Sequence, residues 1–302
     1  MDRIHKILTR RLWEDRLFNL LGFLCTCLGL VTLLILLGNL ALDGANRIDW
    51  QFLSSFPSRF AHKAGILSAW VGTLMVMTVT AAAAIPLGIA AAIYLEEYAG
   101  QNRLTGFIEI NIANLAGVPS IIYGLMALGL FVYKFRLGES ILTAGLTLGF
   151  LVLPIIIVAT RESLRSIPAE IREASYSQGA TKWQTVWNHL LPYASGGIAT
   201  GVIIALSRAI GETAPLITIG ALTFIAFLPP SPVQPAPPFL SLDWTWSQFT
   251  VLPIQMFNWV SRPQKEFHFN AAATGLILII VTLSFNAVAI YVRYRMRRRI
   301  KW

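Results

Sequence analysis

The sequence predicts an all-α, polytopic membrane protein with six transmembrane helices. Of its 302 residues, 55% are hydrophobic and 13% are charged, whereas an ordinary soluble domain carries about 25% charge. The charges are gathered between long uncharged runs, and about 20 apolar residues are what a helix needs to cross a bilayer. The composition excludes a disordered chain and a disulfide scaffold, and it disfavours a soluble enzyme.

Six uncharged runs of 21 to 32 residues mark the expected spans, at residues 17–42, 64–95, 110–133, 140–160, 183–207 and 267–292. The first run is longer than the roughly 7–15 residues of a signal-peptide core, so we expect it to remain as a helix. Residues 213–228 are also apolar, but Pro229 and Pro230 stop the run. This segment is a seventh span, the outer end of the fifth, or a re-entrant piece.

The distribution of Lys and Arg predicts that both chain ends are cytoplasmic. The basic tails 1–16 and 293–302, Arg103 and the loop after the fourth span place sixteen Lys and Arg residues on one side, against seven on the other. Both ends then share a side, which requires an even number of spans. The C-terminal tail directly follows an apolar span, so we expect it to contact membrane lipid and not nucleic acid.

Outside the spans, the long external loop at 226–269 is rich in proline, which prevents regular helix there. Its tryptophans, Trp244, Trp246 and Trp259, are expected to form an interfacial belt, with a docking surface as the alternative. Cys25 and Cys27 face different sides of a helix, which disfavours a disulfide. The four histidines have no paired spacing, so we expect neither a metal nor a cofactor.

A cytoplasmic segment has a distinctive spacing of Glu, Gly and Pro. Glu173 and Ala174 precede Gly179 by the same intervals as in the EAA loop of ABC-importer permeases, and Leu191 and Pro192 complete the pattern. The segment resembles that loop, with Ser175 in place of the second alanine and His189 in place of the usual isoleucine. The resemblance implies that loop 161–192 couples the chain to an ATPase. The coupling residues it implies are Glu173, Ala174, Gly179, Ala180, Leu191 and Pro192.

The physical character of this loop suits such a role. Pro168 and Glu170 favour the start of a short helix, and Gly179 permits a sharp break after it. No Gly-x4-Gly-Lys-Ser/Thr loop occurs in the sequence, so the P-loop ATPase would be a separate polypeptide.

Three further stretches resemble phosphate-importer permeases of the PstA type. Residues 206–216 read LSRAIGETAPL, similar to their ARAIGETAPL signature, and residues 116–125 read AGVPSIIYGL. Residues 65–74 are similar to the start of their second span. Thr213-Ala214-Pro215 favours this type over the sister PstC type, which has Glu-Thr-Met. The resemblance implies the type I ABC-importer permease fold in the bacterial inner membrane. The implied partners are a PstC-like second permease, two copies of a PstB-like ATPase and a PstS-like periplasmic phosphate-binding protein.

Arg208 and Glu212 are charges expected inside the membrane. Arg208 follows Pro192 by 16 residues, or about 24 Å of helix, and a charge at that depth costs about 2.5–3.5 kcal/mol. We therefore expect Arg208 to line a phosphate path with Glu212 as its partner; the alternative is a structural latch between subunits. The remaining candidates for the substrate path are Ser207, Thr213 and Ser120.

Prolines predict helix breaks in the same region. Gly211 and Pro215 flank Glu212, and Pro119 interrupts the third span. The freed backbone groups would need a site lined by water or protein.

The predicted organisation is a basic tail (1–16), a first helix (17–42), a five-helix transmembrane domain (64–292) and a second basic tail (293–302). The expected function is that of a permease subunit and not an enzyme. One alternative is a permease for another oxyanion, molybdate or sulfate. Another is an intramembrane hydrolase using Ser207 or Ser120, disfavoured because no span contains aspartate and the nearest histidines, His189 and His268, lie at span edges or in loops.

Overall fold

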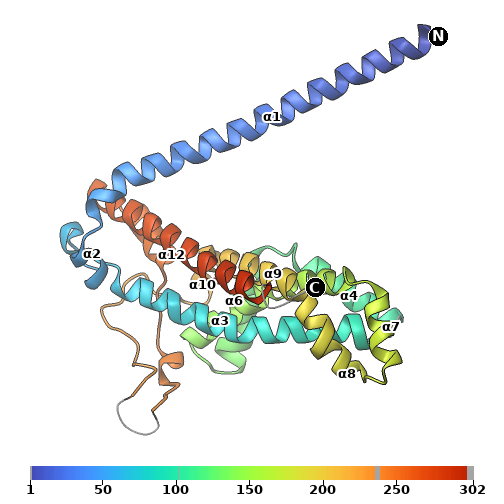
Figure 1. Ribbon diagram of the computed structural model, residues 1–302. Helices are drawn as coiled ribbons and strands as arrows, with labels where there is room; N and C mark the ends of the chain where they lie inside the picture. Colours follow the sequence, from blue (N-terminus) through green and yellow to red (C-terminus); the bar gives the residue numbers. More distant parts are fainter. Residues whose placement is uncertain (1, 101, 235–238, 298–302) are drawn as a thin grey trace.

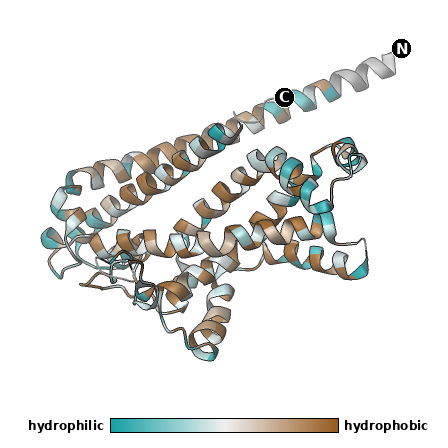
Figure 2. Cartoon of the chain, turned by 60° about the horizontal axis from the view of Figure 1, so that its bottom comes forward, coloured by the Kyte–Doolittle hydropathy of each residue, from teal (hydrophilic) through white to brown (hydrophobic). Residues whose placement is uncertain are grey.

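The computed structural model describes residues 2–100, 102–234 and 239–297, and its regular structure is helical, which confirms the all-α class. Long helices dominate the chain, and Figure 2 shows hydrophobic residues along them and hydrophilic residues gathered towards their ends. The long helices are α1 (Asp2–Gly44), α3 (Leu67–Ile93), α6 (Ile141–Arg165), α9 (Leu191–Gly211) and α12 (Lys265–Arg297). Each coincides with a predicted span, so hydropathy alone located all five.

The centre of the molecule is the packing of α6 between α3 and α9. Small residues allow the helices to approach closely: a Cβ added to Gly88 of α3 would lie 2.6 Å from Ile156 Cγ2 of α6, and one at Gly201 of α9 would overlap Ala159. Membrane helices associate through such small residues, because burial of apolar surface does not distinguish a neighbouring helix from lipid. The main apolar cluster lies along this contact.

The first helix meets the rest of the chain near its C-terminal end. A Cβ added to Gly44 would lie 2.7 Å from the backbone of Ala272 in α12, and α1 then extends away from the body (Figure 1). Cys25 and Cys27 are free thiols on this helix, as their spacing predicts. After α1, the chain forms η1 (Ala45–Arg47), α2 (Trp50–Ser54) and η2 (Ala61–Lys63) before α3 begins.

The third predicted span is a sharply bent pair of helices and not one continuous helix. α4 (Arg103–Leu115) stops before Pro119. The chain then turns by 107° into α5 (Ser120–Ala127), which continues as the π-helix η4 (Leu128–Lys134). Pro119 cannot donate a helical hydrogen bond and restricts the residue before it, which explains the break that its position predicts. The count of six spans therefore holds if the bent pair is one span.

The segment after Glu212 is too short in helix to be a seventh span. α10 (Ala214–Thr218) has five residues. Between it and α11 (Leu252–Val260), the described residues contain the 3-10 helix η6 (Asp243–Trp246), a single β-bridge between Val233 and Leu240, and irregular chain. Residues 235–238 of loop 226–269 and residues 298–302 of the basic tail lie outside the described residues.

The expected tryptophan belt is wrong for two of its three members. Trp244 is 8% exposed and Trp259 is fully buried, whereas Trp246 is 56% exposed. Trp259 packs against the tilted rings of Phe52 and Phe267 at centroid distances of 5.9 and 6.4 Å, in an apolar cluster that joins α2, α11 and α12. The sequence alone does not distinguish a tryptophan at the membrane surface from one that is buried in an apolar cluster beneath a loop.

Candidate functional site

The break after α9 carries the two charges predicted inside the membrane. α9 ends at Gly211, and Glu212 leaves the helical conformation with φ −74° and ψ 129°. Arg208 Nε lies 3.4 Å from Glu212 Oε1, one turn along the helix, so the expected pair forms. The Arg208 side chain remains 45% exposed, against 17% for Glu212. The guanidinium, which has five N–H donors, is therefore accessible from outside the chain.

The second break is the corner between α4 and α5. Leu115 ends α4, and its carbonyl accepts a 2.8 Å hydrogen bond from the hydroxyl of Tyr123, one turn into α5. The last carbonyls of a helix lack partners within it, so Tyr123 satisfies one of them and braces the corner. Ser120 is the first residue of α5 and is half-buried at this corner.

The two breaks lie against each other, although some 90 residues separate them in the chain. A Cβ added to Gly124 of α5 would overlap the hydroxyl of Thr218 and lie 2.7 Å from Pro215 Cα in α10. Both signature stretches of the sequence thus fold into one junction, in which irregular backbone stands within a membrane domain. Such backbone is tolerated only where protein or water satisfies it.

The predicted hydroxyl residues occupy different positions around the junction. Thr213 directly follows the ion pair and precedes α10. Ser207 Oγ lies 2.7 Å from the Ile203 carbonyl and 2.6 Å from Asn286 Oδ1, which ties α9 to α12. Asn286 is an amide and cannot act as a general base for Ser207, which weighs against the hydrolase alternative.

Loop 161–192 folds as two short helices joined by a tight turn. α7 (Ala169–Ser177) presents Glu173 and Ala174 on its exposed side, and α8 (Lys182–Thr185) leads through the π-helix η5 (Val186–Leu190) into α9. Gly179 has φ +79°, a value that disfavours residues with a Cβ, so the sharp break that it predicts is present. Leu191 and Pro192 form the first turn of α9, and Ala180 is half-buried beside the turn.

Two polar contacts fix the shape of this helix pair. Ser175 is buried, and its Oγ lies 2.8 Å from Thr185 Oγ1, so the residue that departs from the EAA pattern joins α7 to α8. Thr181 caps α8 with a reciprocal capping box, in which Gln184 Oε1 accepts from the Thr181 N–H at 2.8 Å. The loop is therefore a defined surface element.

A group of charged residues at the same end of the molecule was missed by sequence reasoning. Glu96 and Glu97 lie in η3 (Tyr94–Tyr98), the π-helical continuation of α3. Glu96 pairs with Arg161 and Arg165 of α6, and Glu97 pairs with Arg172 of α7. Arg161 also pairs with Glu109 of α4. The available signal was a pair of adjacent glutamates directly after one apolar run, with arginines four residues apart after another; charge counting used these residues only for topology.

Comparison with known proteins gives this geometry a context. The family described as "Binding-protein-dependent transport system inner membrane component" matches residues 84–302. The phosphate transport system permease protein PstA 1 of Mycobacterium tuberculosis is 32% identical over 80% of this chain and 74% of its own. PstA of Mycobacterium leprae is 30% identical over 98% and 94%. A chain of the bacterial alginate ABC transporter shares the fold with a TM-score of 0.64, at 16% identity over 95% of this chain and 98% of its own.

The apolar helices and the family match define this chain as a multi-pass membrane subunit of a binding-protein-dependent transport system. It belongs to the family of binding-protein-dependent transport system inner membrane components.

Proposed function

We propose that this chain is the permease subunit of an ATP-driven importer of inorganic phosphate and forms half of the translocation path. The observation that carries the proposal is the junction of the two signature stretches, with an accessible Arg208 at its edge. The planar guanidinium matches a tetrahedral oxyanion with two parallel hydrogen bonds. Relatives that are about 30% identical over most of the chain bear the name of phosphate permeases, which supports phosphate over sulfate or molybdate.

Within the path, Arg208 binds phosphate and Glu212 orients Arg208. A carboxylate would repel an anionic substrate unless it were already paired, and the 3.4 Å ion pair meets that condition. Thr213 and Ser120 offer hydroxyls to the substrate, while Ser207 supports the path by holding α9 to α12. The substrate crosses without covalent change, so the chain itself is not an enzyme.

The proposed partners are a PstC-like second permease, two PstB-like ATPases and a PstS-like binding protein. Both termini and loop 161–192 are cytoplasmic, and loop 226–269 faces the binding protein outside. The exposed Glu173 and Ala174 of α7 suit docking in a surface groove of an ATPase. Closure of the ATPase dimer on ATP then moves the loop and reorients the spans to alternate access.

The test is uptake of labelled phosphate into right-side-out vesicles that contain the complete complex. We expect uptake that requires the ATPase and ATP, and that excess sulfate or molybdate does not reduce. ATP-dependent uptake of sulfate or molybdate with no uptake of phosphate would replace the proposed substrate, and absence of a co-purifying P-loop ATPase would refute the importer itself.

A further inference from the structure

The π-helical end of α3 holds two other elements through two adjacent glutamates. Glu96 pairs with Arg161 and Arg165 of α6, at 3.2 and 2.9 Å. Glu97 pairs with Arg172 of α7 at 2.7 Å. Consecutive helical residues project in different directions, so one end of α3 is fixed to the membrane body and to the cytoplasmic loop at the same time.

The Glu97 carboxylate is buried, and the geometry of its ion pair with Arg172 is constrained. Only 7% of the Glu97 side chain is exposed. Arg172 Nε and Nη2 donate to Glu97 Oε1 at 3.2 and 2.7 Å. Arg172 also donates to the carbonyls of Ile167 and Leu164, each at 3.0 Å. The fork is therefore held in one orientation, and loss of either partner would leave a charge away from water.

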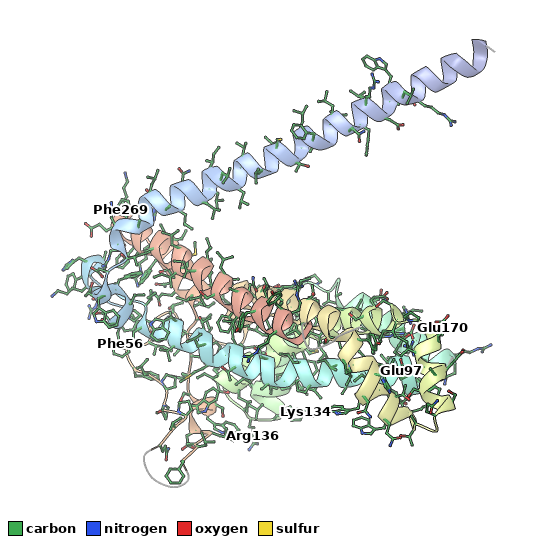
Figure 3. The ribbon with its side chains drawn as sticks, in the orientation of Figure 1. Phe56, Glu97, Lys134, Arg136, Glu170 and Phe269 are labelled. Atoms are coloured by element: carbon green, nitrogen blue, oxygen red, sulfur yellow. The ribbon has the colours of Figure 1, made fainter. Side chains whose placement is uncertain are left out.

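The second helix of the loop is anchored to the same residue. Lys182, at the start of α8, donates to the backbone carbonyl of Glu97 at 3.3 Å and lies over the ring of Tyr98 at 5.8 Å. Figure 3 shows Glu97 where the end of α3 meets α7 and α8, with Glu170 on the outer side of α7. Both short helices thus converge on Glu97, while Glu173 and Ala174 remain exposed.

We propose that the Glu97–Arg172 ion pair is the joint that transmits movement of α7 and α8 to α3. α7 also meets the body through an apolar contact, in which Ile171 packs against the cluster around Leu164. Apolar contacts are non-directional and allow sliding, whereas a forked ion pair fixes angle and distance. Glu97 and Arg172 act as positioning residues and contact neither substrate nor nucleotide. The proposal rests on the proposed coupling to an ATPase and names the residues that carry it.

The test measures whether α7 and α3 move as one body. Spin labels are attached to cysteines replacing Glu170 on α7 and Leu87 on α3, both exposed, in the full complex with Cys25 and Cys27 removed. Distances are recorded with and without ATP. In the otherwise native chain we expect a narrow distribution that ATP leaves in place. In Glu97→Gln we expect a distribution about twice as wide that shifts with ATP, because the fixed fork is lost.

Two further variants keep the result decisive. Glu162→Gln removes a carboxylate that is 67% exposed and 3.6 Å from Arg165, and it should leave the distances unchanged. Arg172→Lys keeps the charge without the planar fork, so this variant should assemble and still widen the distance distribution. It therefore provides the test if Glu97→Gln does not assemble. Unaltered distances in both Glu97→Gln and Arg172→Lys, or a native joint that opens with ATP, would overturn the proposal.

The labels report no substrate, so the joint and the proposed function fail separately. If the wild-type complex imports no phosphate but keeps α7 and α3 together, phosphate is refuted as the substrate and the proposed joint stands. If Glu97→Gln keeps phosphate uptake near the wild-type level and its distances are unaltered, the proposed joint is refuted and the proposed function stands. We expect uptake to fall about fivefold or more in Glu97→Gln, while the ATPase co-purifies at a comparable yield.

Discussion

Arg208 is exposed and also pairs with Glu212. Its two candidate roles, a residue of the substrate path and a latch between subunits, make different predictions. A substrate-path residue should lose transport when its charge is removed, without loss of the complex. A latch between subunits should lose the complex first. The 45% exposure of its side chain favours a group outside the chain as its further partner.

We therefore expect Arg208→Gln to reduce phosphate uptake about tenfold or more while the yield of the complex stays near normal. Arg208→Lys should retain part of the uptake, because lysine keeps the charge without the planar fork. Vesicle uptake and detergent-stable complex yield are measured together. A charge swap, Arg208→Glu with Glu212→Arg, that restores full transport would assign Arg208 to the latch.

At the scale of elements, the contact between α5 and α10 depends on the absence of a side chain at Gly124. A valine there would meet the backbone of Pro215, which has little room to move. We expect Gly124→Val to destabilise the chain by about 1–3 kcal/mol through overpacking. Thermal unfolding in detergent measures this, with Gly129→Val as the matched control, since a Cβ at Gly129 meets no atom within 4 Å. Equal melting temperatures for the two variants would contradict the close contact.

The turn between α7 and α8 makes a second prediction. Gly179 has φ +79°, a conformation that costs an ordinary residue about 1–2 kcal/mol and that asparagine tolerates better. Gly179→Val should therefore lower ATPase co-purification and phosphate uptake together, while Gly179→Asn keeps most of both. Normal values for the valine variant would show that the shape of this turn is not needed for docking.

For the whole molecule, the six-span arrangement predicts which surfaces face outward. Single cysteines replacing Leu240, which is 73% exposed, and Arg295, which is also exposed, are placed in a chain lacking Cys25 and Cys27. In intact cells a membrane-impermeant maleimide should label the first position and not the second, because the charge bias predicts that both termini lie in the cytoplasm. Labelling of the Arg295 position from outside would require an odd number of crossings.

The amino-acid sequence by itself determined the helical membrane class, five of the spans and the break at Pro119. Hydropathy and the missing N–H of proline are local properties, so they act before any tertiary contact forms. The spacing also predicted the break between α7 and α8, where Gly179 adopts the positive φ that the turn requires.

Only the tertiary structure decided which distant residues meet. It bent the third span by 107°, buried Trp244 and Trp259, and joined Gly124 to Pro215. It also brought Glu96 and Glu97 to three arginines from two other helices. A single charge beside an apolar run has the same local signal whether it faces lipid headgroups, water or an opposite charge. Its partner is set by how the helices pack, because the energy of an ion pair depends on the distance between its charges and on their burial.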